Sequence, residues 1–516
     1  MLSRLRAWAG RSTPRRWLPF LALSALIAGA VVIDAETPGL RPEQRDRSLD
    51  PTLLASMPLE DTLSTAWYCG GATAGGDGGL AEMTLVMAND APEGATAEVT
   101  FLTAKSGNET EPQVVEVPAN GSAVLSASDV LTADWVGAIV EVRGGRVAVE
   151  RQVRGPLGYD ASPCSTAAAN NWFVPSGTTV RGSELYLSFF NPFPDTASID
   201  VSFSTESGPR SPRALRGLSI PGRTIRVVAV GKLVTDRQTV AARVQSRVGR
   251  IVVDRVQTYD GTGPQITTSN GAGEVVTPAP KGLVSAPASP VRAQRWVLTG
   301  SRISEGVRSQ IAVYNPGSKV AEVDVVLGYQ DPQRFSDIAP LELSIRPRQH
   351  VMVDLNTVED LEPDSDVWID VRSLDSQPVV VERVSVYGTP SEQVGVATQL
   401  ASPVGARNWL VVQGGATQSS GGSVQVANPG PSDAQIKVFV LEKNNRRELT
   451  GAATKLNAND RRVLDLEGAG EGATVIVEAS HPVVVSSSQV QRSGLGISLS
   501  PAFAFPETIA AFGPVS

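Results

Sequence analysis

The chain has 516 residues, of which 41% are hydrophobic and 19% are charged, and its net charge is -8. This length exceeds what one hydrophobic core supports and predicts three to five domains. The composition is that of globular material, which excludes a largely disordered chain. Nucleic-acid affinity comes from clustered Lys and Arg, so a net negative chain is not expected to bind nucleic acid.

The N-terminus predicts a membrane anchor. Residues 1–16 carry five arginines, residues 17–33 contain no charge, and acidic residues follow from Asp34. Basic residues stay on the cytoplasmic side, so we expect 17–33 to be one transmembrane helix and the bulk of the chain to lie outside the cell membrane. In the alternative, Ala28-Gly29-Ala30 is a signal-peptidase site, and the chain is secreted. Residues 34–62 are expected to be a juxtamembrane spacer.

Two cysteines, Cys69 and Cys164, lie on the expected exported side. An oxidising compartment lets a disulfide persist there, so we predict that they are bonded. If the segment after Tyr159 still belongs to the first domain, the bond ties that domain's first strand to its last segment.

Two sequence markers recur four times in step. Tryptophans at 67, 172, 296 and 409 are separated by 105, 124 and 113 residues. Each precedes an alternating strand that ends at an asparagine, and these are Asn89, Asn191, Asn315 and Asn428. The last three begin Asn-Pro dipeptides, which favour turns, so we interpret the asparagines as turn formers.

A third marker closes the first three repeats with an acidic residue and an arginine. The pairs are Glu150-Arg151, Asp254-Arg255 and Glu382-Arg383, whereas the fourth repeat has Ser486-Ser487. Adjacent residues of a strand point to opposite faces, so the two members of a pair cannot meet. We therefore expect each side chain to bond to a neighbouring strand or to a domain junction, and a ligand or acid/base role is a lesser alternative.

The markers divide the chain into four β repeats of about 100 residues. We assign repeat 1 to 63–168, repeat 2 to 169–260, a Gly/Pro/Ser-rich linker to 261–293, repeat 3 to 294–400 and repeat 4 to 401–516. Alternating runs of Val, Ile, Thr and aromatic residues predict about seven short strands in each repeat. The predicted fold class is all-β, with four tandem immunoglobulin-like sandwiches, and a β-propeller is the alternative.

Few residues are candidates for catalysis or metal binding. The only histidines, His350 and His481, are interpreted as surface or turn residues, so neither a histidine triad nor a zinc site is expected. The acidic loop 360–370 could supply calcium ligands, but a solvated loop is the preferred interpretation. We expect no enzyme activity, no cofactor and no metal.

The tryptophan start, the strand ending in Asn-Pro and the closing Val-Val-Glu-Arg resemble the repeat of an actinobacterial family of membrane-anchored exported proteins, known only as a domain of unknown function. The resemblance covers most of residues 65–505 and implies export and a β-rich fold. It implies no activity. The first repeat departs from the pattern with Asn89-Asp90, and the fourth repeat lacks the acid-arginine pair.

Two functions follow as hypotheses. The first is a non-enzymatic cell-envelope scaffold or adhesion-like binding protein, with envelope proteins or wall polysaccharide as partners. The second is a carbohydrate-binding or carbohydrate-acting protein, in which the four recurring tryptophans form stacking platforms. A place in each core is the preferred interpretation of these tryptophans, and Trp135 and Trp368, outside the repeat pattern, are the better candidates for exposed contacts.

Overall fold

The structure, a computed structural model, describes residues 49–75, 79–270, 273–277, 279–329, 338–362, 364–388, 394–412, 419–464, 466, 468–470, 472–491 and 495–512. The predicted cytoplasmic segment 1–16, the predicted anchor 17–33 and the spacer up to residue 48 lie outside these ranges. In the described part, the only helices are 3₁₀ turns of three residues, and no helix could span a membrane. The prediction of an all-β chain is confirmed.

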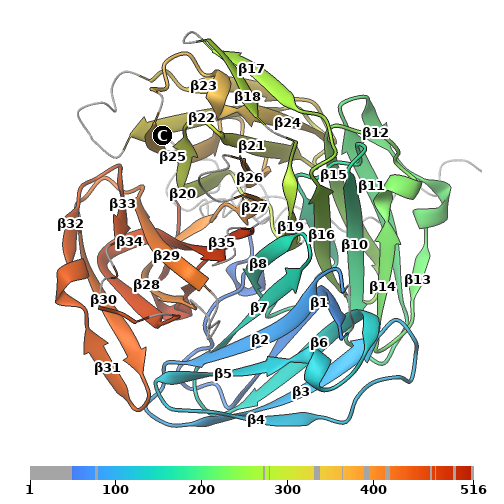
Figure 1. Ribbon diagram of the computed structural model, residues 1–516, viewed down its shortest axis with the longest axis vertical. Helices are drawn as coiled ribbons and strands as arrows, with labels where there is room; N and C mark the ends of the chain where they lie inside the picture. The colour runs from blue at the N-terminus through green and yellow to red at the C-terminus, as the bar shows by residue number, and fades with distance from the viewer. Residues whose placement is uncertain are drawn as a thin grey trace, which may run out of the picture. The chain divides into compact units, whose positions relative to one another are not determined.

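Four consecutive segments share one arrangement of strands (Figure 1). In each segment, four strands form an inner sheet, and four to six others pair in an outer sheet. We call them segment 1 (64–165), segment 2 (169–289), segment 3 (293–402) and segment 4 (404–511).

Segment 1 follows η2 (Pro51–Leu53) and contains η3 (Ala127–Asp129). Its outer sheet has the order β4 (Gln113–Val117), β3 (Ala95–Thr103), β6 (Ala133–Arg143), β1 (Ser64–Ala74). Its inner sheet has the order β5 (Gly121–Ser126), β2 (Glu82–Asn89), β7 (Val147–Gly155), β8 (Gly158–Pro163).

Segment 2 contains η4 (Arg213–Leu215) and η5 (Val230–Lys232). Its outer sheet consists of β12 (Gly208–Arg210) and β13 (Leu218–Ile220), which both pair with β11 (Ala197–Thr205), then β15 (Val240–Val248) and β9 (Asn171–Val174). Its inner sheet has the order β14 (Thr224–Ala229), β10 (Ser183–Asn191), β16 (Val252–Asp260), β19 (Lys281–Pro287). A separate hairpin pairs β17 (Ile266–Asn270) with β18 (Gly273–Thr277).

Segment 3 contains η7 (Leu355–Thr357). Its outer sheet has the order β23 (Leu341–Ile345), β22 (Ala321–Tyr329), β25 (Ser365–Ser373), β20 (Arg295–Ile303). Its inner sheet has the order β24 (Gln349–Asp354), β21 (Val307–Asn315), β26 (Val380–Tyr387), β27 (Gly395–Leu400).

Segment 4 contains η8 (Thr450–Ala452) and η9 (Pro506–Thr508), and its long strand β34 (Thr474–Gln491) belongs to both sheets. The outer sheet adds β31 (Asn445–Glu448), β32 (Thr454–Leu456), β30 (Ala434–Glu442), β28 (Val404–Val411), β36 (Phe503–Ala504) and β37 (Ile509–Ala511). The inner sheet adds β33 (Asp460–Leu464), β29 (Ser419–Asn428) and β35 (Ile497–Pro501).

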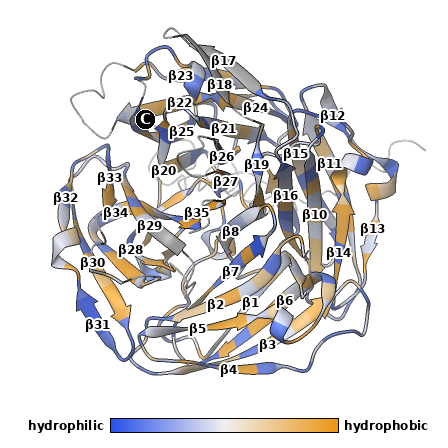
Figure 2. Ribbon diagram, viewed as in Figure 1, coloured by the Kyte–Doolittle hydropathy of each residue, from blue (hydrophilic) through white to orange (hydrophobic). Residues whose placement is uncertain are grey.

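The two sheets of each segment pack face to face, because one hydrophobic cluster takes side chains from both. In segment 2, for example, Leu187 of the inner sheet and Val201 of the outer sheet belong to the same cluster. Apolar residues alternate with polar ones along the outer strands, as expected for strands with one buried face (Figure 2).

The innermost strands of the four segments meet one another. β8 contacts β19 and β35, and β27 contacts the same two strands, so the four contacts form a closed cycle (Figure 1). We call β8, β19, β27 and β35 the central strands. Residues 48–516 form one compact unit.

A glycine stands at the start of each central strand because the strands approach closely there. A Cβ on Gly282 would lie 2.5 Å from the Val396 nitrogen, and one on Gly496 would lie 2.5 Å from the Tyr159 nitrogen. Gly395 faces Ile497 in the same way, and Gly158 faces Leu283. Each glycine thus touches the residue that follows the glycine of the next central strand.

The predicted linker 261–293 is wrong as a structural assignment. It contains β17, β18 and the central strand β19, which pairs along β16. Repeat 2 therefore extends to Ser289, whose amide and carbonyl bond to Phe173 at the start of the segment. Gly, Pro and Ser indicated a loop, but Leu283 and Val284 are buried where four segments meet.

Candidate functional site

The four marker tryptophans are core residues. Their exposed fractions are 0% for Trp67, 0% for Trp172, 1% for Trp296 and 3% for Trp409. The Trp172 indole N–H donates to the carbonyls of Ala169 and Ile251, and the indoles of segments 3 and 4 make the equivalent pairs of bonds. The indole rings therefore cannot serve as carbohydrate platforms.

The two tryptophans outside the repeat pattern differ from each other. Trp368 is 1% exposed, so the prediction of an exposed contact there is wrong. Trp135 is half-buried, and its ring lies 5.2 Å from that of Tyr186, between segments 1 and 2.

The four marker asparagines are buried, and the side chain of each makes several hydrogen bonds to the backbone. The Asn315 side-chain amide donates to the carbonyls of Lys319 and Ile345, at 2.8 and 2.9 Å, and its oxygen accepts from the Gly317 amide at 2.9 Å. Asn89, Asn191 and Asn428 make the same set of bonds. Each asparagine forms the turn and also ties it to a second loop about 30 residues further along the chain.

The predicted disulfide between Cys69 and Cys164 is confirmed, with an S–S distance of 2.02 Å. Cys69 lies in β1, and Cys164 follows the central strand β8. Beside the disulfide, Tyr68 and Ser165 exchange two backbone hydrogen bonds. The disulfide thus joins the first strand of segment 1 to its last.

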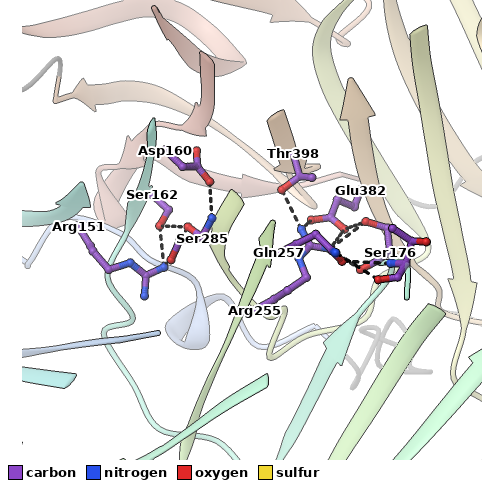
Figure 3. Close-up of polar contacts among 10 residues, drawn as sticks. Arg151, Asp160, Ser162, Ser176, Arg255, Gln257, Ser285, Glu382 and Thr398 are labelled. Carbon is purple, nitrogen blue, oxygen red and sulfur yellow. Dashed lines mark hydrogen bonds and ion pairs between the residues drawn. The ribbon is translucent and has the colours of Figure 1, made fainter. Parts of the chain in front are cut away.

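The acid-arginine markers form ion pairs between successive segments. At the junction of segments 1 and 2, Arg151 donates to Asp254 at 2.8 Å, and both side chains are almost fully buried. The same guanidinium donates to the Ser162 hydroxyl on β8 and to the Ser285 carbonyl on β19 (Figure 3). Burial raises the pKa of Asp254, and the charge of Arg151 opposes that rise.

The junction of segments 2 and 3 repeats this design. Arg255 donates to both carboxylate oxygens of Glu382, at 2.7 and 3.0 Å, and to the Thr398 hydroxyl on β27 at 2.8 Å (Figure 3). The Ser176 hydroxyl donates to Glu382 at 2.6 Å. The arginine of one segment thus binds the acid of the next segment directly, and it also donates to groups on the central strands.

Within the described ranges of the chain, the marker ion pair between successive segments is missing at both junctions of segment 4, with segment 3 and with segment 1. Ser486 and Ser487 occupy the register positions of the acid and the arginine. Among the described residues, Arg383 therefore has no carboxylate partner and donates to Gln399 at 2.6 Å, while Glu150 accepts from Gln152 at 3.2 Å and has no cation. Burial lowers the pKa of Arg383 to about 10 and raises that of Glu150 to about 8.

Neutral hydrogen bonds replace the marker ion pair between the central strands of segments 1 and 4, and elsewhere in this junction Arg146 pairs with Glu507 at 3.0 Å. The Tyr159 hydroxyl donates to Gln489 at 2.6 Å, and the Ser498 hydroxyl bonds both the amide and the carbonyl of Ala161 at 2.9 Å. Asp160, beside them, accepts from the Ser285 amide at 2.7 Å. Burial raises the pKa of Asp160 to about 7, although these hydrogen bonds oppose the rise.

The remaining candidates are structural as well. In the acidic loop, Asp370 is buried between Arg295 and Arg372, and Asp366 contacts Arg302, so guanidinium groups neutralise these carboxylates. No group of three or more His, Cys, Asp or Glu residues suited to a metal ion occurs in the described ranges.

His350 is half-buried and lies in the strand β24 rather than in a turn, and its Nδ1 lies 2.8 Å from the Ser204 hydroxyl of segment 2. Burial lowers its pKa to about 4. Ser204 is fully buried, so this pair does not offer an accessible nucleophile.

A small cavity of about 100 Å³ lies where the central strands end. Residues of all four segments line it, including Pro163, Pro287 and Pro501, and residues 53–56 also border it. The sequence carried a signal for this centre, since Gly158, Gly282, Gly395 and Gly496 are 124, 113 and 101 residues apart and begin similar short runs.

The chain is therefore an all-β protein whose recurring polar residues hold its segments together. It belongs to a family of unknown function, DUF5719, whose model matches residues 147–272 and 252–512. No curated protein is significantly similar to it.

Among solved structures, a Thermotoga maritima protein, "Thermotoga maritima 1070", is similar at 16% identity, over 22% of this chain and 94% of its own, with a TM-score of 0.19. Streptomyces avermitilis alpha-L-rhamnosidase in complex with L-rhamnose is similar at 10% identity, over 87% of this chain and 58% of its own, with a TM-score of 0.12. These scores carry no argument about fold or function.

Proposed function

We propose that the protein is a non-enzymatic scaffold of the cell envelope, which holds a rigid β body outside the membrane and presents its outer surfaces to an envelope partner. The observation that carries the proposal is the burial of the recurring polar residues. The two Arg–carboxylate pairs bond groups of neighbouring segments and the central strands, as expected for residues that fix the positions of domains.

Export through the basic segment 1–16 and the apolar run 17–33 is part of this proposal, with release by signal cleavage as the alternative. The buried disulfide supports export, because disulfides persist in oxidising compartments. Thiol labelling of intact cells tests this point. Cys69 and Cys164 are expected to react only after reduction, and labelling without a reductant would argue for a reducing compartment.

We further propose that each segment is a sandwich of the immunoglobulin-like class. In the outer sheets of segments 1 and 3, the third, fourth and sixth strands pair as C, C′ and F do, while the second and fifth strands pair in the inner sheets as B and E do. The seventh strand takes the place of A, and the first takes that of G. Each segment uses about 100 residues for two sheets, which is close to the roughly 40 to 45 residues of one propeller blade per sheet, so the pairing order and not the sheet size favours the sandwich over the β-propeller alternative.

Crosslinking in intact cells tests the proposed function. A photoreactive amino acid replaces Val114, Val248 or Leu374, which are 65%, 61% and 56% exposed. We expect a covalent adduct with an envelope component from at least one position, and none from the same chain irradiated after lysis and dilution. A folded, exported chain that gives no adduct from any of the three positions would contradict the scaffold proposal.

A further inference from the structure

One edge of segment 2 carries a strong local positive charge despite the net charge of -8. The run 208–229 contains five arginines and no acidic residue, and these are Arg210, Arg213, Arg216, Arg223 and Arg226. We call this run the arginine edge. The net charge of the whole chain does not reveal this local positive charge, because the excess of acidic residues lies elsewhere in the sequence.

The fold places the arginine edge along the last strands of both sheets of segment 2, and β14 there packs beside β3 and β6 of segment 1. β12 and β13 pair only with β11, and β14 pairs only with β10, so these strands end their sheets (Figure 1). The Arg226 guanidinium donates to the Ser219 carbonyl of β13 at 2.8 Å, which brings the two edges together. Arg226 of the inner sheet therefore reaches the edge of the outer sheet, which also carries Arg210.

Acidic neighbours neutralise only part of this charge. Arg223 pairs with Glu109 of segment 1, and Asp200 bonds the Gly217 amide and Arg247. The pKa of Asp200 is lowered, chiefly by its hydrogen bond to Arg247, and Arg216 contributes to the lowering. Arg210, Arg213 and Arg226 are exposed and have no acidic partner in residues 79–270, all of which are described, or in the other described ranges.

We propose that the arginine edge binds a linear anionic polymer with closely spaced phosphate or carboxylate groups. Guanidinium groups bind both groups through paired hydrogen bonds, and a line of them matches a repeating charge. This inference rests on the proposed function, because a wall polymer is the polyanion that an exported chain meets. A structural explanation also exists, since charged residues on edge strands prevent the edges of separate molecules from pairing.

The test compares two variants of the full chain with equal loss of charge. One is Arg210→Gln/Arg213→Gln/Arg226→Gln, and its control is Lys319→Gln/Arg346→Gln/Arg407→Gln, which removes exposed cations of segments 3 and 4. Binding to long-chain polyphosphate and to polygalacturonate is measured between 50 and 300 mM salt, beside vesicles rich in anionic phospholipid.

We expect the unchanged chain and the control to bind at least one of the two polymers. The arginine variant is expected to bind that polymer at least tenfold more weakly, with a slope of log affinity against log salt that is smaller by about two to three. Equal losses in both variants, binding to vesicles alone, or no loss in the arginine variant would overturn the proposal. A variant that only self-associates, with polymer binding unchanged, would assign the arginines to edge protection.

The two proposals can fail separately. If crosslinking in cells still yields an envelope adduct while no polymer is bound, the scaffold proposal stands and the polyanion inference falls. If the isolated chain binds polymer through the arginine edge but gives no adduct in cells, the scaffold proposal falls.

Discussion

Gly282→Ala tests the close approach of the central strands β19 and β27. The added Cβ would lie 2.5 Å from the backbone nitrogen of Val396 and 3.1 Å from its Cβ. An ordinary contact needs at least about 3.4 Å, so the two strands must separate by about 1 Å. Neither neighbouring atom belongs to a flexible side-chain end, so the strain cannot be relieved by a rotamer change.

The magnitude follows from two opposed effects. Overpacking of this kind costs about 1 to 3 kcal/mol. Loss of backbone freedom in the unfolded chain returns about 0.4 to 1 kcal/mol for a Gly→Ala change. We therefore expect Gly282→Ala to lower the free energy of unfolding by about 1 to 2 kcal/mol.

Gly451→Ala is the matched control. Gly451 lies in η8, its φ is not positive, and no heavy atom lies within 4 Å of an added Cβ. This change is expected to be neutral or to stabilise by a few tenths of a kcal/mol. Urea unfolding of both variants, followed by tryptophan fluorescence, measures the difference. Equal stability of the two variants would refute the close packing of β19 against β27.

Three further predictions concern the junctions and the disulfide of segment 1. Arg151→Met leaves Asp254 buried without a cation and is expected to lower the free energy of unfolding in urea by about 3 to 5 kcal/mol. Adding Asp254→Leu to this variant should restore most of the loss. The control Arg247→Met breaks an exposed ion pair and should lower the free energy of unfolding by less than about 1 kcal/mol. The folded chain holds the Glu150 proton more tightly than the unfolded chain, so its contribution to stability is full below pH 4.5 and is lost as the pH rises to about 8. Glu150→Gln should remove that loss, up to about 1.4 kcal/mol per pH unit, and an unchanged pH profile of the variant would contradict it. Cys69→Ala/Cys164→Ala should lower stability by up to about 4 to 5 kcal/mol, and a reductant should then affect the unchanged chain but not the variant.

Much of the fold could be predicted from the sequence because the repeats carry local signals. Alternation of apolar residues indicated the strands, and the spacing of Trp67, Trp172, Trp296 and Trp409 indicated the four segments. The buried positions of Asn191 and Asn315 were less evident, because Asn-Pro indicates a turn but does not reveal a second loop bonded to the same side chain.

The contacts between segments could not be predicted in the same way. The opposite directions of Asp254 and Arg255 follow from strand geometry, but their partners Arg151 and Glu382 lie more than 100 residues away. The segment 261–293 was misassigned because β19 is only seven residues long and is flanked by Gly and Pro. A comparison of Gly158, Gly282, Gly395 and Gly496 would have identified the four central strands.

The central strands β8, β19, β27 and β35 hold the four segments together as one body. Hydrogen-exchange mass spectrometry of the full chain measures the opening free energy of each of these strands. We predict that all four exchange slowly and through one common opening. Independent, fast exchange of any one central strand, with the other three still protected, would contradict a single body of four segments.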